Sequence, residues 1–364
     1  MSQLVSPAEI ETKLAYIWDS FQGTNKMRAC LFNLIIYTQQ GARTTYFSTI
    51  AQKVIEKFPS RILFITYNDK ATDRELKTAV SVMTAEAGTS VIACDLIEVA
   101  VSAHNQLQVP FVILPHILPD LPIYVVYADD PTAKNPIAKE LEVLANRVIF
   151  DSESSPDLTA FARTVTEKHH REQIDVADLN WARIEGWRQL FANVFKAPDE
   201  LDLLRQAVKI EIDFNAYTTA ALCQTKTQSI YLQSWLANRL GWNLNGVVHK
   251  KNELIFSYKT KSQSLEIALK PKEMPGTLPG RPLAVAIETA TENRYLFQRK
   301  ADHPHHVIIE KSTPAACSLP TTFIFEQDVS GKSLVSEICH KGSSEHYLKM
   351  LAQLAQLQPK ELCP

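Results

Sequence analysis

Apolar runs alternate with amphipathic stretches through the first 165 residues of the chain. Each run is continuous, as in strands that are buried on both faces: RACLFNLIIY (28–37), RILFITY (61–67), SVIACDLIEVAV (90–101), PIYVVYA (122–128) and RVIFDS (147–152). Helix-like stretches separate them, at 44–57, 72–86 and 133–146. Strands that alternate with helices predict an α/β domain with an open, partly parallel sheet.

The pattern changes after residue 165. A helix is predicted over 178–195, a strand at VKIEIDF (208–214) and a long helix near 217–240. From 252 onward, short strands follow one another roughly ten residues apart, as in an antiparallel meander, and a last helix is expected at 345–356. We therefore predict two domains, an α/β domain over 1–165 and an α+β domain over 166–364, with the 178–195 helix connecting them.

Composition and charge narrow the classes of partner. Of the 364 residues, 45% are hydrophobic and 21% are charged, which is typical of a globular protein rather than a disordered one. The formal net charge of −2 provides no long-range field for a phosphate backbone, and no basic patch of convincing length is present. We expect no nucleic-acid partner.

The cysteines and the apolar stretches indicate a cytoplasmic protein with reduced thiols. Six cysteines occur singly, without a CxxC pair, whereas disulfide scaffolds are short and dense in cysteine. No signal peptide is evident, and the most membrane-like stretch, 109–128, contains prolines that a spanning helix tolerates poorly. That stretch is predicted to be a buried turn and strand, so no membrane partner is expected.

The motifs of known active sites are missing or incomplete. SGKS (330–333) lacks the glycine that a phosphate loop needs five residues before Gly331, and no GxGxxG follows the N-terminal strands. HPHH (303–306) has no acidic or thiol partner at metal-ligand spacing. Asp129 and Asp130 follow a strand end, where ligands bind α/β sheets, but turn and cap chemistry is favoured there. We predict no catalytic, cofactor-binding or metal-binding residue.

The segment ADLNWARIEGWR (177–188) carries two of the five tryptophans. On a helix, Asp178 would cap the N-terminus, or Asp175 would do so slightly earlier. Trp181, Ile184, Trp187, Phe191 and Val194 would form one apolar stripe with Arg183 and Arg188 at its edges. Such a stripe packs against a core, and we favour that interpretation for Trp181 and Ile184. Tryptophan and arginine are also enriched among interface hot spots, and Trp187 is the residue predicted to be partly exposed.

A second aromatic segment, WLANRLGW (235–242), is predicted to end a helix, with Gly241 as the residue that follows its last turn. Arg239 and Trp242 lie at this end. Interior packing is favoured for them, with partner binding as the alternative.

Several of these segments, taken in order, resemble the motifs of the glucose-6-phosphate dehydrogenase assembly proteins, the OpcA family: ILPDLPIYVVY (117–127), RVIFDS, ADLNWARIEGWR and WLANRLGW. The resemblance covers about residues 10 to 245, and tyrosines stand at 124 and 127 where the family pattern has tryptophan. It implies a protein without catalytic activity or cofactor that assembles and activates glucose-6-phosphate dehydrogenase in the oxidative pentose phosphate pathway. It also implies candidate partner-binding residues: Pro119, Asp120, Asp178, Asn180, Trp181, Arg183, Trp187, Arg188, Arg239 and Trp242.

Two other functions stay open beside the one that the resemblance implies. The predicted sheet with Asp129 and Asp130 at a strand end is also consistent with an enzyme that binds a sugar phosphate or a nucleotide. A subunit that tethers the dehydrogenase without changing its kinetics is the second alternative.

Overall fold

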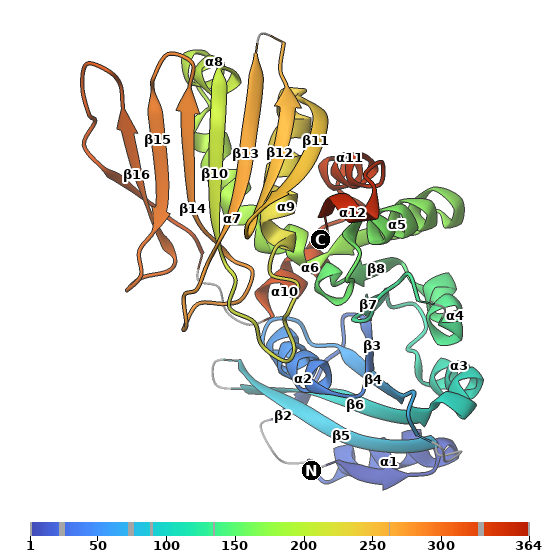
Figure 1. Ribbon diagram of the computed structural model, residues 1–364. Coiled ribbons are helices and arrows are strands. Elements are labelled where there is room, and N and C mark those ends of the chain that lie inside the picture. Colours follow the sequence, from blue (N-terminus) through green and yellow to red (C-terminus); the bar gives the residue numbers. More distant parts are fainter. Residues whose placement is uncertain are drawn as a thin grey trace. The chain divides into compact units, whose positions relative to one another are not determined.

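The computed structural model describes residues 2–21, 26–71, 76–87, 90–133, 135–261, 263–326 and 331–362 (Figure 1). Contacts divide the chain into two units that interleave in sequence. The first comprises Met1–Asp151, Glu167–Leu179 and Ser330–Ser343, and the second comprises Ser152–Thr166, Asn180–Val329 and Ser344–Pro364. The domain boundary expected between residues 165 and 166 stays a prediction. Within the described residues, every helix is too short or too polar to cross a membrane.

The first unit is built on a sheet in the order β1-β5-β6-β4-β3-β7-β8-β9, with β2 paired to β6. Its strands are β1 (Gln3–Val5), β2 (Lys26–Arg28), β3 (Asn33–Gln39), β4 (Arg61–Asn68), β5 (Leu76–Ala87), β6 (Ser90–Ser102), β7 (Ile123–Tyr127), β8 (Arg147–Phe150) and β9 (Asp175–Asp178). Neighbours from β6 through β4, β3, β7 and β8 to β9 pair in parallel, while β5 pairs with β6 and β1 in antiparallel fashion. The predicted open, partly parallel sheet is confirmed.

The predicted helix at 72–86 is wrong for the residues that the structure describes. Residues 76–87 form β5, which pairs with β6 from Leu76↔Val101 to Ala87↔Ser90. Polar residues on β5 obscure the period of two in the sequence, and long-range pairing with an apolar strand decides the conformation. Residues 72–75 lie outside the described residues.

Helices cover both faces of the first sheet: η1 (Pro7–Glu9), α1 (Ile10–Asp19), α2 (Ala42–Ile55), η2 (Ala103–Gln108), α3 (Val109–Ile113), η3 (Leu114–His116), α4 (Pro136–Leu144) and α10 (Lys332–Cys339). Ile50 and Val54 of α2 and Leu334 of α10 share one buried cluster with Ile36 and Phe64 of the central strands. The run 103–116 is helical, so the turn predicted to precede β7 consists largely of short helices.

The second unit carries a sheet in the order β11-β12-β13-β10-β14-β15-β16-β17. Its strands are β10 (Ala207–Asn215), β11 (Asn243–Lys250), β12 (Glu253–Lys259), β13 (Ser264–Lys272), β14 (Pro282–Thr289), β15 (Arg294–Arg299), β16 (His306–Ser312) and β17 (Thr321–Ile324). The predicted short strands form, but β10 lies between β13 and β14 and pairs with β13 in parallel. The sheet is therefore a meander interrupted by an earlier strand.

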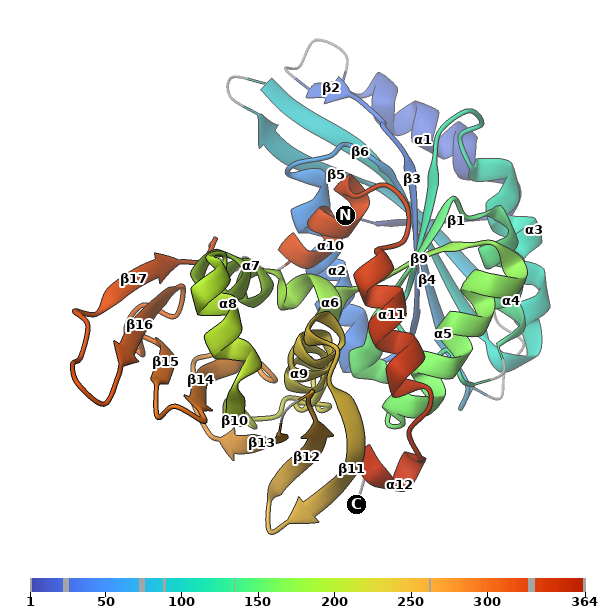
Figure 2. The ribbon, with the colours of Figure 1, turned by 90° about the horizontal axis from the view of Figure 1, so that it is seen from above.

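Helices α7 (Glu185–Val194), α8 (Pro198–Arg205) and α9 (Thr227–Leu240) lie against one face of this sheet, as both views show (Figures 1 and 2). The other helices that contribute to this unit are η4 (Ser152–Ser154), α5 (Leu158–Glu172), α6 (Leu179–Arg183), α11 (Glu345–Leu354) and α12 (Pro359–Leu362). The long helix predicted from residue 217 begins ten residues later. Gly241 follows α9 in the left-handed conformation, with φ 67°, as predicted.

Candidate functional site

The tryptophan–arginine segment folds as three elements rather than as one helix over 178–195. Asp178 ends β9, α6 covers Leu179–Arg183, and α7 begins at Glu185 after a break at Ile184. Asp178 is fully buried and directly precedes α6, which is the position expected of the residue that caps this helix. Asp178 is the one residue of the predicted helix that belongs to the edge strand β9, which pairs with β8.

Trp187 is fully buried, so its predicted partial exposure is wrong. Its ring meets Phe325 edge-on at a centroid distance of 5.4 Å and lies 6.1 Å from the Phe191 ring. The guanidinium of Arg299 lies 5.5 Å from the Trp187 ring centroid. Gly186 permits this packing, because a Cβ atom there would lie 3.1 Å from the Phe325 ring. The glycine thus allows α7 to pack closely against Phe325, the residue that follows β17 (Thr321–Ile324).

Trp181 is also buried, as predicted, and its ring lies 5.6 Å from that of Tyr347 on α11. The Arg188 guanidinium stacks over the Trp181 ring at 3.6 Å, and its Nη2 donates to the Trp181 carbonyl at 3.3 Å. Arg188 is only half-buried, so the cation–π pair places one charged group at the surface above the core.

Arg183 and Asn180 belong to a hydrogen-bonded chain at the start of α6. Arg183 Nη1 donates to Asn180 Oδ1 at 2.8 Å, and Asn180 Nδ2 donates to Ser152 Oγ at 3.0 Å. Asn180 is fully buried, so its amide orients the arginine rather than meeting solvent.

At the end of α9, the two candidates differ in exposure. Trp242 is buried with its ring 6.3 Å from that of Tyr258, whereas Arg239 is exposed. Arg239 Nη1 lies 3.5 Å from Nε2 of His346. Partial burial and the charge of Arg239 lower the pKa of His346, which favours the neutral imidazole that accepts from the guanidinium.

Pro119 and Asp120 form an exposed loop in the first unit. Asp120 adopts a positive φ of 65°, which aspartate tolerates better than most residues. The buried Asn33 fixes the loop: its Nδ2 donates to the carbonyls of Leu118 and Leu121 at 3.0 and 3.4 Å, and its Oδ1 accepts from Leu118 N at 2.8 Å. Sequence reasoning identified the loop but not Asn33, whose place in an apolar strand was the available signal.

An apolar stripe that was not predicted from the sequence lies just before this loop. Leu107, Phe111 and Leu114 are exposed on the helical run 103–116, at positions i, i+4 and i+7. On the opposite side of the same run, Val109 and Ile113 are buried. The helical spacing of both sets was the signal that could have identified them.

Asp129 and Asp130 lie at the carboxyl end of β7 and have different environments. Asp130 accepts from Thr132 N and Thr132 Oγ1 at 3.0 and 2.8 Å, so it stabilises a turn, whereas the helix cap favoured from the sequence is formed by another residue. Asp129 Oδ1 accepts from Gln39 N at 3.1 Å, while its Oδ2 is buried without a hydrogen-bond partner among the described residues. Burial raises the pKa of Asp129 to about 6. The α4 cap is Asn135, whose side chain accepts from two backbone amides.

Other groups in the described residues do not assemble into a reactive site. The rings of His303, His305 and His306 lie 4.4 to 6.1 Å apart, yet no group of three or more His, Cys, Asp or Glu in this part of the chain could hold a metal ion. A cavity of about 450 Å³ lies between α2 and strands β4 to β6, and it contains none of the sequence-predicted residues. Of the ten candidates, Pro119, Asp120 and Arg239 are the exposed ones.

Comparison with known families decides the identity. Residues 51–167 match the model of the glucose-6-phosphate dehydrogenase subunit N-terminal domain, and residues 174–329 match the model of its C-terminal domain. The chain belongs to the OpcA family. Among curated relatives, this OpcA-family chain is 28% identical over 173 residues to a putative oxidative pentose phosphate cycle protein OpcA of Synechococcus elongatus, and 26% identical over 200 residues to that of Nostoc punctiforme.

The matched regions cover 47% and 53% of this OpcA-family chain but only 37% and 40% of those relatives. The chain therefore spans about two fifths of their length. Among solved structures, levoglucosan dehydrogenase in complex with NADH and levoglucosan aligns with a TM-score of 0.49 at 8% identity, over 90% of this chain and 95% of that one.

Proposed function

We propose that this chain acts in the cytoplasm as a non-catalytic assembly factor and activator of glucose-6-phosphate dehydrogenase in the oxidative pentose phosphate pathway. The match to both domain models of the family is the observation that carries the proposal. The names of the curated relatives, which refer to the same cycle, support it. The family match does not favour the sugar-phosphate or nucleotide enzyme.

The mechanism that we propose is linkage. A protein that binds the active oligomer more tightly than the inactive one shifts the dehydrogenase toward the active form. A shift of about 100-fold needs about 2.7 kcal/mol of differential affinity, which a few well-packed contacts supply.

We propose that the contacts come from the first unit, through the stripe of Leu107, Phe111 and Leu114 together with the Pro119–Asp120 loop. Apolar anchors at i, i+4 and i+7 on a helix are the usual pattern by which a helix enters a hydrophobic groove. The hydrogen bonds of Asn33 hold the neighbouring loop in one conformation, which lowers the entropy cost of binding. Arg239 is the exposed candidate on the second unit, and the buried tryptophans serve to hold the fold.

Mixing the purified chain with the dehydrogenase tests the function. We expect the activity at saturating substrate to rise and the mass of the dehydrogenase particle to increase. A change in mass without a change in activity would identify a tether, and turnover of a sugar phosphate by the isolated chain would identify an enzyme.

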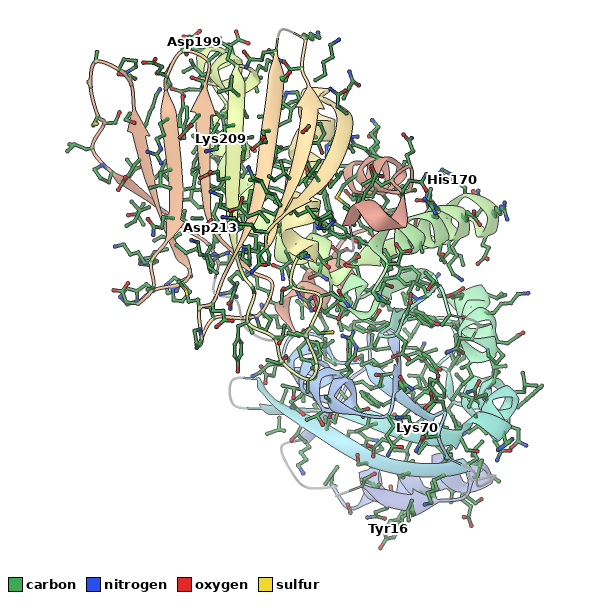
Figure 3. All side chains as sticks on the ribbon, in the orientation of Figure 1. Tyr16, Lys70, His170, Asp199, Lys209 and Asp213 are labelled. Carbon is green, nitrogen blue, oxygen red and sulfur yellow. The ribbon has the colours of Figure 1, made fainter. Side chains whose placement is uncertain are left out.

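The docking surface is tested with a matched pair of exposed aromatic residues. Phe111 is 78% exposed and Tyr16 is 66% exposed, and Tyr16 points away from α1 in the same unit (Figure 3). Phe111→Ser should weaken the complex with the dehydrogenase about 30-fold, which corresponds to a hot-spot loss of about 2 kcal/mol. Tyr16→Ser should leave the affinity unchanged. Equal effects of the two substitutions on affinity, measured by titration, would contradict this surface.

A further inference from the structure

In the described part of the chain, helices lie against only one face of the second sheet (Figures 1 and 2). These helices are α7, α8 and α9. Ile210 and Ile212 of β10 are buried, as expected for side chains that point toward these helices. Side chains alternate between the faces of a strand, so Lys209 and Asp213, both labelled on β10 in Figure 3, lie on the opposite, open face. Lys209 retains 42% of its side-chain exposure there.

One row of side chains crosses this open face at the level of Lys209. Backbone register places Lys209 opposite Glu266 on β13 and opposite Glu288 on β14. In the same register, Glu266 pairs with Ser257 on β12. On the other side, Glu288 pairs with Arg294 on β15, and Arg294 pairs with Ser312 on β16. From β12 to β16 the row therefore reads Ser257, Glu266, Lys209, Glu288, Arg294, Ser312.

This row is self-complementary about the middle of the sheet. Strands β10 and β14 are the two central strands, with β11, β12 and β13 on one side and β15, β16 and β17 on the other. When a second copy of the row is reversed about the line between β10 and β14 and laid against the first, every acid meets a base and each serine meets a serine. The centre of charge complementarity thus coincides with the centre of the sheet.

We propose that a second copy of this chain packs face to face on the open sheet, with a two-fold axis parallel to the strands between β10 and β14. Such an axis is the one that reverses the row, so Lys209 faces Glu288 of the second copy and Glu266 faces Arg294. A two-fold axis across the strands would instead set acid against acid and base against base. The charges therefore select both the occupant and its orientation.

The ion pairs inside one chain leave these groups available. Lys209 Nζ binds Glu211 along its own strand at 2.9 Å, and Glu211 is shared with Lys270 at 2.6 Å. Glu266 forms no ion pair within the described part of the chain, and Arg294 Nε lies 3.8 Å from Glu288. Lys209 thus keeps hydrogen-bond donors beyond its ion pair with Glu211, and Glu266 can pair with a second copy.

The adjoining row provides the apolar contact that such packing needs. By register, the whole row from β12 to β16 reads Ile255, Ala268, Glu211, Ala286, Leu296, Glu310. Across the proposed axis Ala268 faces Leu296, while Ala286 faces Glu211 and Ile255 faces Glu310. The small side chains of Ala268 and Ala286 leave room for two sheets to approach to about 10 Å, the usual spacing of packed sheets. The proposal concerns this chain alone and does not depend on the dehydrogenase.

Charge reversal at Glu266 and Arg294 tests the proposal by sedimentation and light scattering. The wild-type chain should have twice the 41.0 kDa monomer mass. Glu266→Arg and Arg294→Glu should each raise the dimer Kd at least ~100-fold, because each sets like charges together twice per dimer. An equimolar mixture of the two variants should form a heterodimer with an affinity within about tenfold of the wild type, since every facing pair is again opposite in sign.

Lys139→Glu, an exposed reversal on α4 of the first unit, serves as the control and should remain dimeric. Melting curves check that each variant is folded. A monomeric wild type at micromolar concentration, variants that stay dimeric, or a mixture that stays monomeric would each overturn the proposal. A monomeric wild type whose complex with the dehydrogenase is lost on reversal would assign the face to that partner instead.

Discussion

Replacing Asp129 by asparagine should stabilise the protein at neutral and alkaline pH. The carboxylate lies at the carboxyl end of β7, where Oδ1 accepts from Gln39 N and Oδ2 is buried without a partner among the described residues. Asparagine keeps an acceptor for Gln39 and removes the charge that burial penalises. The neighbouring Arg43 favours the charge but does not outweigh the burial.

The magnitude follows from the difference in pKa between the folded and unfolded chains. Burial raises the pKa of Asp129 from 3.8 to about 6, so the folded state binds the proton more tightly than the unfolded state. Ionisation therefore lowers stability as pH rises between these two values, and the full cost, about 3 kcal/mol, is present above pH 6. At pH 4.5 only about a third of that cost has developed. The new buried amide group offsets part of the gain by about 1–2 kcal/mol.

Urea unfolding of the wild type and of Asp129→Asn at pH 4.5 and pH 8 measures this effect. The difference in free energy of unfolding, variant minus wild type, should be about 2 kcal/mol larger at pH 8 than at pH 4.5. The comparison between the two pH values cancels any pH-independent cost of the amide. A difference that is the same at both pH values, or larger at pH 4.5, would show that the carboxylate is not destabilised by burial.

Two further substitutions test the packing of each unit. Asp95→Ala should lower the free energy of unfolding by about 3–5 kcal/mol, because Asp95 accepts from Nε and Nη2 of the buried Arg61 at 3.1 and 2.8 Å. Urea unfolding measures the loss, and a loss below about 1 kcal/mol would mean that solvent reaches the arginine. Gly186→Ala should cost about 1–2 kcal/mol, because the new Cβ meets the Phe325 ring between Trp187 and Arg299. Adding Phe325→Leu should recover part of that loss, whereas a rise in Tm for Gly186→Ala alone would refute the close packing.

Apolar runs that are buried on both faces could be predicted from the sequence because their pattern needs no tertiary information. The strands at 33–39, 61–68 and 147–150 lie where the runs place them. A helix is predicted over 72–86 because polar residues interrupt the apolar ones in this stretch, and only the pairing of residues 76–87 with β6 shows a strand. The local sequence pattern thus mispredicts elements whose conformation depends on pairing with another strand.

The helix predicted over 178–195 forms, but in two parts: α6 covers Leu179–Arg183 and α7 covers Glu185–Val194, with a break at Ile184. Asp178 itself ends β9, whose pairing with β8 no helical periodicity reveals. The stripe of Trp181, Ile184, Trp187 and Phe191 is nevertheless buried as a set, because hydrophobic spacing predicts which side chains are inside even where the helix is broken. Exposure of a single residue on such a stripe depends on what lies across from it, and Phe325, more than a hundred positions away, covers Trp187.

The residues that resemble a family motif differ from the residues that a partner can contact. Trp181 and Trp187 are shielded from solvent, so a substitution there changes binding only through the fold. Arg188, stacked on Trp181, and the loop at Pro119 and Asp120, fixed by a buried asparagine, reach the surface because buried groups hold them there. Residues that define a motif can therefore support a binding surface from the interior as well as form part of that surface. Partner binding should accordingly be most sensitive, at constant stability, to exposed positions that border a motif rather than to the tryptophans that define it.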